Sequence, residues 1–577
     1  MLILSSSGCS KSVDINQSQL ERYPIASDVF TTLQKTVVPD SIPPGSETVL
    51  PYEISTFKQN GYGSWSYGPG IDSAKRLDIM PANYSGPSVT NSTRLLNFFA
   101  MTDIHITDKE TPAQVIYLGY KGGISSGYSP VMLYTTQVLD AAVQTINAIH
   151  KENQFDFGIS LGDSINSAQY NELRWFIDVL DGKNITPDSG VKDDPISGPY
   201  NDYQDEYQAA GLNKTIKWYQ TLGNHDHFWM CSFPVNDSHR QSYISDTILK
   251  FIDPLADPPS EREYYMGVID GSTPYGDIVG AGPVGDFLNP PKVVADLDRY
   301  SLLRTEWISE FFNTSSEPFG HGFNLVDLNQ ENGFACYSFV PKSTIPIKVI
   351  VLDDTQREDD GSPDIHGHGF LDLARWDWLK KELAAGDAAG QLMVIAAHVP
   401  IKVELPDNET AWWVNPDEDA VIQNAVDLSG LIAELQSHPN LLMWLSGHRH
   451  LSTVKAFISP DPVNHPEYGF WQVETPSLRD FPQQFRTFEI YLNSDDTISI
   501  LATNVDPAVK EGTPAATSRK YAIAATQIVE TWGLTTKWNP TNDSTIKPMP
   551  TGSYNAELVK QLSPAMKAKM KGLGTFN

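Results

Sequence analysis

Cysteine, basic side chains and long apolar runs are all scarce in this chain of 577 residues. Three cysteines are too few for a disulfide framework or for a zinc site with four thiolate ligands. Cys231 and Cys336 either pair in an oxidising compartment or remain free, buried thiols, and the sequence leaves both interpretations open. No apolar run approaches the roughly 18 residues that a membrane-spanning helix requires, so we expect no transmembrane segment.

Basic residues are outnumbered by acidic ones. Lys and Arg total 41 against 71 Asp and Glu, which gives a formal net charge of −30. A chain this acidic repels nucleic acid and anionic membranes, so we expect neither to bind through broad surface charge. Hydrophobic residues make up 40% of the chain, including 13 Trp, 24 Tyr and 24 Phe, and this composition argues against disorder. Gly and Pro, at 40 each, favour a loop-rich globular fold over a bundle of long helices.

The first nine residues resemble the end of a bacterial lipoprotein leader. A short apolar stretch is followed by Gly8 and Cys9, although it is shorter than the usual leader core of about 7–15 residues. One interpretation is an exported protein of the periplasm or cell envelope with a lipid anchor at Cys9. The alternative is a disordered N-terminus of a cytoplasmic protein.

Strand-like and helix-like segments alternate along most of the chain. Apolar runs typical of buried strands lie at residues 95–101, 155–161, 216–222, 347–352, 392–397 and 441–445, with further sheet expected at 469–473 and 485–504. Amphipathic helices are expected at 139–149, 171–180, 373–383 and 428–435, the third of them ended by Gly386. Repeated strand, helix and strand predict an α/β protein.

Polar residues that can bind metal follow five of the predicted strands. Collected from the strand ends, they are Asp103, His105, Asp163, Asn224, His225, His398, His448 and His450. Sites in open α/β sheets usually form at the carboxyl ends of strands. A nitrogen and oxygen ligand set without thiolates suits Mn, Fe or Zn rather than calcium. Seven or more ligands exceed the needs of one tetrahedral ion, and two adjacent ions that share a carboxylate would account for the number.

These strand ends form five blocks in a fixed order. The blocks are Asp103-Ile104-His105, Gly162-Asp163, Gly223-Asn224-His225-Asp226, a lone His398, and Gly447-His448-Arg449-His450. Over residues 94–505 the chain thereby resembles the calcineurin-like metallophosphoesterases. The resemblance implies a four-layer α/β/β/α sandwich of two mixed sheets flanked by helices, with the metal site at the carboxyl ends of the strands.

The resemblance also implies a role for each block residue. One metal would be held by Asp103, His105 and His450, the other by Asn224, His398 and His448, and Asp163 would bridge the two.

Two further residues of the third block have implied roles in catalysis. His225 would be a non-ligand histidine that points at the substrate phosphate. Asp226 would orient it through its second ring nitrogen. Purple acid phosphatases place a Tyr three residues after the bridging Asp, where this chain has Asn166, so a tyrosinate-iron centre is disfavoured.

The implied activity is hydrolysis of a small phosphate ester by a dinuclear metal site, through in-line attack of a metal-bridging hydroxide. Phosphodiesters are slightly favoured over phosphomonoesters, and the alternative is a catalytically inactive metal-binding scaffold of the same fold. His227 either lines the substrate pocket or caps the following turn. Arg449 either contacts the phosphate or points away from it.

Outside the blocks, the chain divides into three parts. An N-terminal extension of loops and short strands, with the leader remnant, covers 1–92; the metallophosphoesterase domain covers 93–505; and a partly helical C-terminal extension covers 506–577. Within the domain, residues 228–346 lack strong periodicity, and irregular stretches this long are usually lids or subdomains. We expect this insert either to wall the metal cleft and limit substrate size or to be a stabilising surface excursion.

Overall fold

A computed structural model gives the fold of most of the chain. It describes residues 20–86, 89–122, 125–191, 196, 198–231, 233–252, 262–358, 367–405, 408–411, 413–414, 422–531 and 552–572. The expected lipid anchor at Cys9 lies outside these residues. None of the helices that they form has the length and apolar character needed to cross a membrane.

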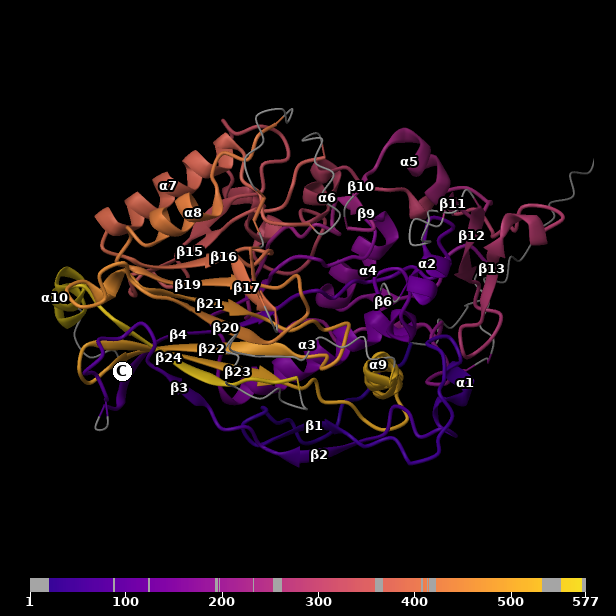
Figure 1. The fold of residues 1–577 in the computed structure, drawn as a ribbon, viewed down its shortest axis with the longest axis horizontal. Coiled ribbons are helices and arrows are strands. Elements are labelled where there is room, and N and C mark those ends of the chain that lie inside the picture. The colour runs from indigo at the N-terminus through magenta and orange to yellow at the C-terminus, as the bar shows by residue number, and fades with distance from the viewer. Residues whose placement is uncertain are drawn as a thin grey trace, which may run out of the picture.

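Two large sheets dominate the structure (Figure 1). The six-stranded sheet has the order β14 (Tyr337–Phe339), β15 (Ile347–Val351), β16 (Leu392–Ala396), β19 (Leu441–Ser446), β21 (Phe470–Glu474), β20 (Thr453–Phe457). The seven-stranded sheet has the order β3 (Ala74–Arg76), β24 (Ala556–Gln561), β23 (Thr497–Val505), β22 (Phe485–Asn493), β4 (Asn91–Met101), β5 (Phe157–Ser160), β8 (Trp218–Gln220). Both sheets combine parallel and antiparallel pairs. The prediction of a mixed α/β protein with two mixed sheets is confirmed.

The two sheets pack face to face through aromatic side chains. Phe98 of β4 stacks between Phe157 and Phe488 on one face of the seven-stranded sheet. Phe157 in turn meets Phe339 of the six-stranded sheet, with ring centroids 5.4 Å apart. Because successive strand residues point to opposite faces, the neighbouring Phe99 packs away from this interface, against Phe155.

Helices cover the outer surfaces. The helices α7 (Leu373–Ala388) and α8 (Leu428–Leu435) bury apolar side chains against the six-stranded sheet, on the face that looks away from the other sheet (Figure 1). The helices α3 (Thr135–Glu152) and α4 (Tyr170–Asp181) bury theirs in the core cluster that contains β4 and β5. Each helix overlaps one that the periodicity predicts.

One predicted helix end is wrong. α7 continues past Gly386 to Ala388 instead of stopping there. Gly386 is buried, and a Cβ atom on it would lie 2.3 Å from the sulfur of Met393 in β16. Glycine at this position allows close packing of helix on strand and does not mark a helix end.

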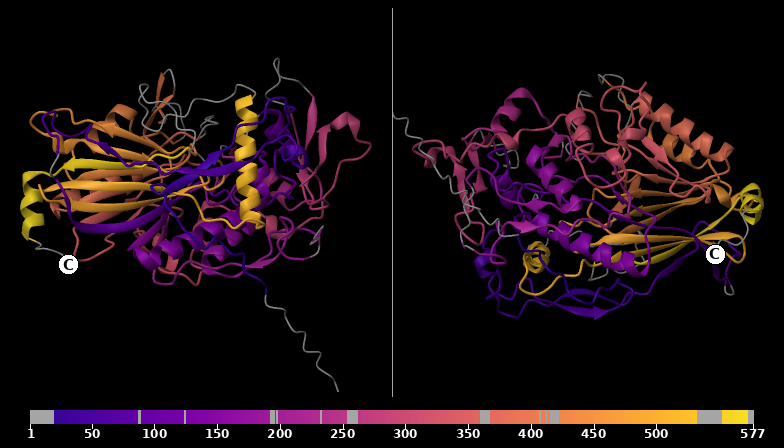
Figure 2. Two further views of the ribbon diagram at one scale, coloured as in Figure 1. Left: turned by 90° about the horizontal axis from the view of Figure 1, so that it is seen from below. Right: turned by 180° about the vertical axis from the view of Figure 1, so that it is seen from behind.

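Both predicted extensions contribute to the core. β3 from the N-terminal segment and β24 from the C-terminal segment pair with each other and complete the edge of the seven-stranded sheet. The helix α9 (Pro514–Thr531) lies beside the N-terminal segment, where Gln527 Nε2 donates to the carbonyl oxygen of Asp40 at 2.8 Å (Figure 2). Strands β1 (Lys35–Pro39) and β2 (Trp65–Pro69) form a separate antiparallel pair.

The predicted insert contains a small sheet of its own. Its elements are β9 (Phe228–Trp229), β10 (Phe233–Pro234), α5 (Asp237–Tyr243), β11 (Lys250–Ile252), β12 (Glu263–Ile269), β13 (Ile278–Pro283) and α6 (Arg304–Glu310), of which β11, β12 and β13 pair antiparallel. β14, near the end of the stretch at about 228–346, pairs with β15 in the six-stranded sheet. Short elements elsewhere are α1 (Ile54–Phe57), α2 (Ile116–Gly122), β6 (Asn184–Ile185), β7 (Tyr207–Gln208), β17 (Lys402–Leu405), β18 (Asn408–Ala411) and α10 (Pro564–Gly572).

Candidate metal centre

The five blocks converge where strands of both sheets end. Asp103, Asp163 and Asn224 follow β4, β5 and β8 of the seven-stranded sheet, whereas His398 and His448 follow β16 and β19 of the six-stranded sheet. The backbone turns sharply there: Asp103, His105, Asp163, His448 and His450 all have positive φ angles, between 47° and 77°. Such left-handed conformations are uncommon for residues other than glycine, and they concentrate at functional sites.

Glycines allow the blocks to approach each other closely. A Cβ atom on Gly162 would lie 2.7 Å from the backbone nitrogen of Gly223 and 2.8 Å from Nδ1 of His398. Gly162 therefore brings the second, third and fourth blocks into direct contact.

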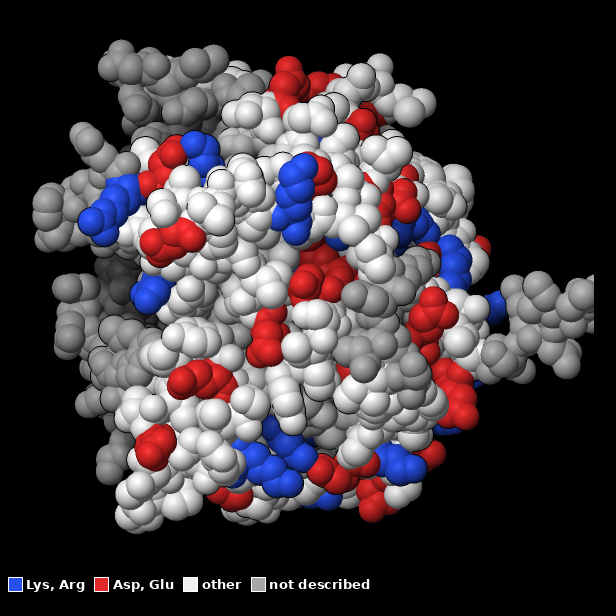
Figure 3. Space-filling model, turned by 90° about the vertical axis from the view of Figure 1, so that its right-hand side faces the viewer, with Lys and Arg blue, Asp and Glu red and all other residues white. Residues whose placement is uncertain are grey.

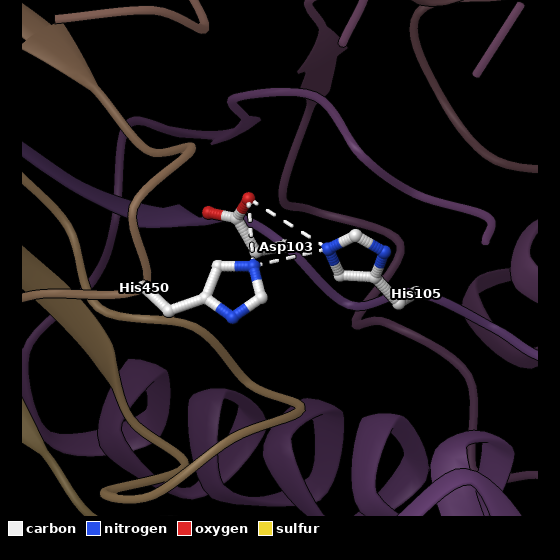
Figure 4. Close-up of side chains that lie close together, drawn as sticks. All are labelled: Asp103, His105 and His450. Atoms are coloured by element: carbon white, nitrogen blue, oxygen red, sulfur yellow. Dashed lines mark hydrogen bonds and ion pairs between the residues drawn. The ribbon is translucent and has the colours of Figure 1, made fainter. Parts of the chain in front are cut away.

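The first cluster consists of Asp103, His105 and His450 (Figure 4). Nε2 of His105 lies 3.1 Å from Nε2 of His450, and Asp103 Oδ1 lies 3.4 Å and 3.9 Å from His450 Nε2 and His105 Nε2. Ligands of a tetrahedral zinc ion, bound at about 2.0–2.1 Å, lie roughly 3.3 Å from one another. The spacing and the mixed donor set fit a metal ion.

The second cluster has the same spacing. Asn224 Oδ1 lies 2.9 Å from Nε2 of His398 and 3.1 Å from Nδ1 of His448, and these two nitrogens are 3.2 Å apart. His448 thus turns its Nδ1 inward, whereas His398 uses Nε2. These three donors are the set that the resemblance assigns to a second metal.

Asp163 connects the two clusters. Its Oδ2 lies 3.2 Å from His398 Nε2 in one cluster and 3.6 Å from His105 Nε2 in the other. Burial opposes ionisation of this carboxyl, but His398 and His225 hold its pKa well below the ordinary value. The structure therefore brings all seven predicted ligands together, with an ionised carboxylate where a shared ligand would have to lie.

Groups outside the ligand set fix the orientation of the histidines. Asp480 Oδ2 lies 2.6 Å from Nδ1 of His450, and the carbonyl oxygen of Leu161 lies 2.8 Å from Nδ1 of His398. Such outer partners orient metal-binding imidazoles. Sequence reasoning missed Asp480, since no local pattern pairs it with a histidine 30 residues away.

The expected partner of His225 is wrong. Nδ1 of His225 contacts the backbone carbonyl of Asn166 at 2.6 Å and not the Asp226 carboxylate. Asp226 instead accepts backbone N–H bonds from Asp163, Ser164, Ile165 and Gly223, at 2.8–3.3 Å. Burial beside Asp163 raises the pKa of Asp226, but four donors need lone pairs on both oxygens and favour its ionised form. Asp226 therefore shapes the loop that carries Asp163.

The structure gives protein partners to His227 and Arg449, the two residues for which the sequence left a substrate contact open. His227 is buried, with Nδ1 2.7 Å from Glu358 Oε1 and Nε2 3.0 Å from Thr355 Oγ1, so both ring nitrogens hold the loop that follows β15. Arg449 forms a two-point ion pair with Glu474, at 2.9 Å and 2.7 Å, which directs its guanidinium toward β21. The pairing with Glu474 separates the Arg449 guanidinium from the cluster residues His448 and His450 on either side of it.

The cysteine question is settled by the fold. Cys231, which is half-buried, and Cys336, which is buried, form no disulfide with each other.

No protein-family model and no curated protein matches the sequence. Solved structures with a similar fold include three that represent different enzymes. A dimetal phosphatase from Danio rerio has 12% identity and a TM-score of 0.35, over 72% of this chain and 100% of that chain. PhoD has 9% identity and a TM-score of 0.34, over 88% and 79%. The sulfate thiohydrolase SoxB of Thermus thermophilus has 11% identity and a TM-score of 0.28, over 78% of this chain and 62% of that chain. The five strand-end blocks, gathered in paired His and Asp clusters between two mixed sheets, confirm the resemblance of this chain to the calcineurin-like metallophosphoesterases.

Proposed function

We propose that this chain is a dinuclear-metal hydrolase that cleaves phosphate esters. The observation that carries the proposal is the position of Asp163 Oδ2, within 3.6 Å of donor nitrogens from both clusters. A carboxylate shared in this way fits two ions about 3.5–4 Å apart, the separation typical of two-metal phosphoesterase sites. The four-layer α/β/β/α order is part of the proposal and is supported by α7 and α8 outside one sheet and α3 outside the other.

The donor set favours Mn, Fe or Zn. Asp103 and Asp163 supply oxygen, four imidazoles supply nitrogen, and Asn224 adds a neutral oxygen. Two such ions would supply Lewis-acid stabilisation of the phosphate and lower the pKa of a bound water. His225 lies beside the first cluster, with its ring centroid 4.4 Å from that of His105. From there it would donate a proton to the leaving oxygen or a hydrogen bond to the phosphate.

The proposed substrate is a small ester and not a polyanion. On the face shown in Figure 3, Lys and Arg side chains lie scattered between Asp and Glu side chains. Such a surface suits a substrate that is held by metal ions in a local site.

The test is metal analysis combined with a substrate panel. We expect two Mn, Fe or Zn ions per chain and hydrolysis of phosphodiesters, with phosphomonoesters cleaved somewhat more slowly. A protein that binds two ions and cleaves none of the phosphomonoesters, phosphodiesters, cyclic nucleotides or glycerophospho-compounds would instead be the inactive scaffold.

Export with a lipid anchor at Cys9 is a separate proposal, tested by labelling cells with a radioactive fatty acid and comparing Cys9→Ser.

A further inference from the structure

The imidazole of His225 is held by an unusual partner. Because the carbonyl oxygen of Asn166 can only accept a hydrogen bond, Nδ1 of His225 must carry the proton of that 2.6 Å contact. The other ring nitrogen, Nε2, is then the one left to act on substrate. The direction in which it points depends on where the Asn166 carbonyl lies.

Asn166 is itself fixed on every side. It is fully buried, and its backbone nitrogen donates to the carbonyl oxygen of Ile106 at 3.0 Å. Its side-chain Nδ2 donates to the carbonyl oxygen of Ser126 at 3.1 Å. Its Oδ1 accepts from Nη1 of Arg479 at 3.1 Å. A residue anchored through all its polar atoms can hold a neighbour with little freedom of movement.

Arg479 is placed at a high energetic cost. Its side chain is 1% exposed, and among the described residues no carboxylate forms an ion pair with it. Its guanidinium bonds only to neutral oxygens, of Asn166 and of Ser125 at 2.8 Å, and its Nε has no partner. The carboxylates of Asp480 and Glu172 act on this cation without a direct ion pair, and burial outweighs them and lowers the pKa of Arg479. Its backbone nitrogen also approaches the carbonyl oxygen of Asp103, at 3.3 Å, so the residue links two parts of the site.

We propose that Arg479 is a positioning residue for His225 and acts through Asn166. The chain of contacts is Arg479 Nη1 to Asn166 Oδ1, then Asn166 carbonyl to His225 Nδ1. This replaces the carboxylate that the sequence assigned to the same task. The catalytic consequence rests on the proposed function, whereas the orientation of the imidazole does not.

The test is a double-mutant cycle of Arg479→Gln and His225→Gln, with kcat, KM and metal content measured for each. We expect R479Q to lower kcat by about 10- to 100-fold with two metals retained, as typical for partners that orient a site residue. In the H225Q background, R479Q should reduce kcat little further. Arg479 is proposed to affect catalysis only through the His225 imidazole, which H225Q has already removed. Equal losses in both backgrounds would overturn the proposal.

Two further variants distinguish the positioning role of Arg479 from a general loss of stability. Arg486 is equally buried and bonds Ser452, just before β20, and Asn504 of β23, so R486Q imposes a similar cost without touching Asn166. We expect R486Q to reduce stability and leave kcat unchanged; an equal loss of kcat in R486Q would contradict a specific role. If R479Q does not fold, Asn166→Ala replaces it, since this variant keeps the backbone carbonyl and removes the side-chain hydrogen bonds of Asn166. We expect N166A to lower kcat in the wild-type background and to have little further effect on kcat in the H225Q background. A wild-type kcat in N166A would overturn the proposal.

A readout without turnover separates this proposal from the proposed function. The Nδ1 proton of His225 should give a downfield imidazole resonance in metal-free protein, identified by its loss in H225Q. We expect R479Q to shift or broaden it and R486Q to leave it in place. A resonance unaffected by R479Q would overturn the positioning role whether or not the protein hydrolyses phosphate esters.

Discussion

Asp480 Oδ2 lies 2.6 Å from Nδ1 of His450, and this contact directs the other nitrogen of His450 toward Asp103, 3.4 Å away. The carboxylate stands six residues beyond β21, whereas both other residues follow different strands. The arrangement is a carboxylate–histidine pair of the kind that orients a metal ligand.

Removal of that carboxylate should weaken one metal site more than the other. We expect Asp480→Ala to lower metal affinity at the Asp103, His105 and His450 cluster by about 10- to 100-fold. Titration against a competing chelator would show one weakened and one intact ion. Asp246→Ala, which removes a largely exposed carboxylate paired with Lys292, is the control and should bind both ions normally. Equal weakening of both sites would contradict the assignment.

His225 should matter for turnover and not for metal binding. Because general acid–base groups contribute about 10²- to 10⁴-fold, we expect His225→Gln to reduce kcat by that order. Metal content should remain two ions per chain. The matched control is His438→Gln, since His438 is buried in the turn that follows α8 and pairs with Asp387. Loss of metal in H225Q would show that His225 is a ligand.

Gly367 lies against the second cluster. A Cβ atom on it would be 3.0 Å from Asn224 Nδ2 and 3.2 Å from His448 Cε1, and its φ is 65°. We expect Gly367→Ala to displace these side chains and to reduce bound metal from two ions toward one, measured by elemental analysis. Gly512→Ala is the control. The φ angle of Gly512 is 82°, but a Cβ atom added there would have no atom beyond its chain neighbours within 4 Å, so this variant introduces backbone strain without a steric clash. Two tightly bound ions in G367A would be the contrary result.

Lys560 should make stability depend on pH. Its side chain is buried in β24, donating to the carbonyl oxygen of Gly469, and burial lowers its pKa from 10.5 to about 7. Between these values the unfolded chain binds a proton that the folded chain does not, so stability falls as pH falls from about 10.5 to 7.

Replacement of this lysine should remove that part of the pH dependence. We expect the wild-type chain to lose on the order of 4 kcal/mol of unfolding free energy over this window relative to Lys560→Met. Denaturant unfolding at pH 7 and at pH 10.5 measures the difference. Lys292→Met removes an exposed lysine and should keep the wild-type slope. An unchanged slope in K560M would show that Lys560 stays protonated in the fold.

The sequence by itself determined the candidate metal ligands and their order. Each block is local: an apolar run predicts a buried strand, and the polar residues directly after it lie at the carboxyl end of that strand. Asp103 after β4 and His398 after β16 needed no knowledge of the other sheet. The same local reasoning located α3 and α4, because their periodicity reflects one buried face.

Tertiary structure alone decided which groups support those ligands. Arg479 and Asn166 are 313 residues apart, and Asp480 reaches back 30 residues to His450. Asp226 is adjacent to His225 in sequence, yet its carboxylate turns to the backbone of Asp163 and Gly223. A hydrogen bond depends on direction and distance after the two sheets have packed, and spacing along the chain specifies neither. The candidate metal ligands could therefore be found from sequence, whereas the groups that orient them could not.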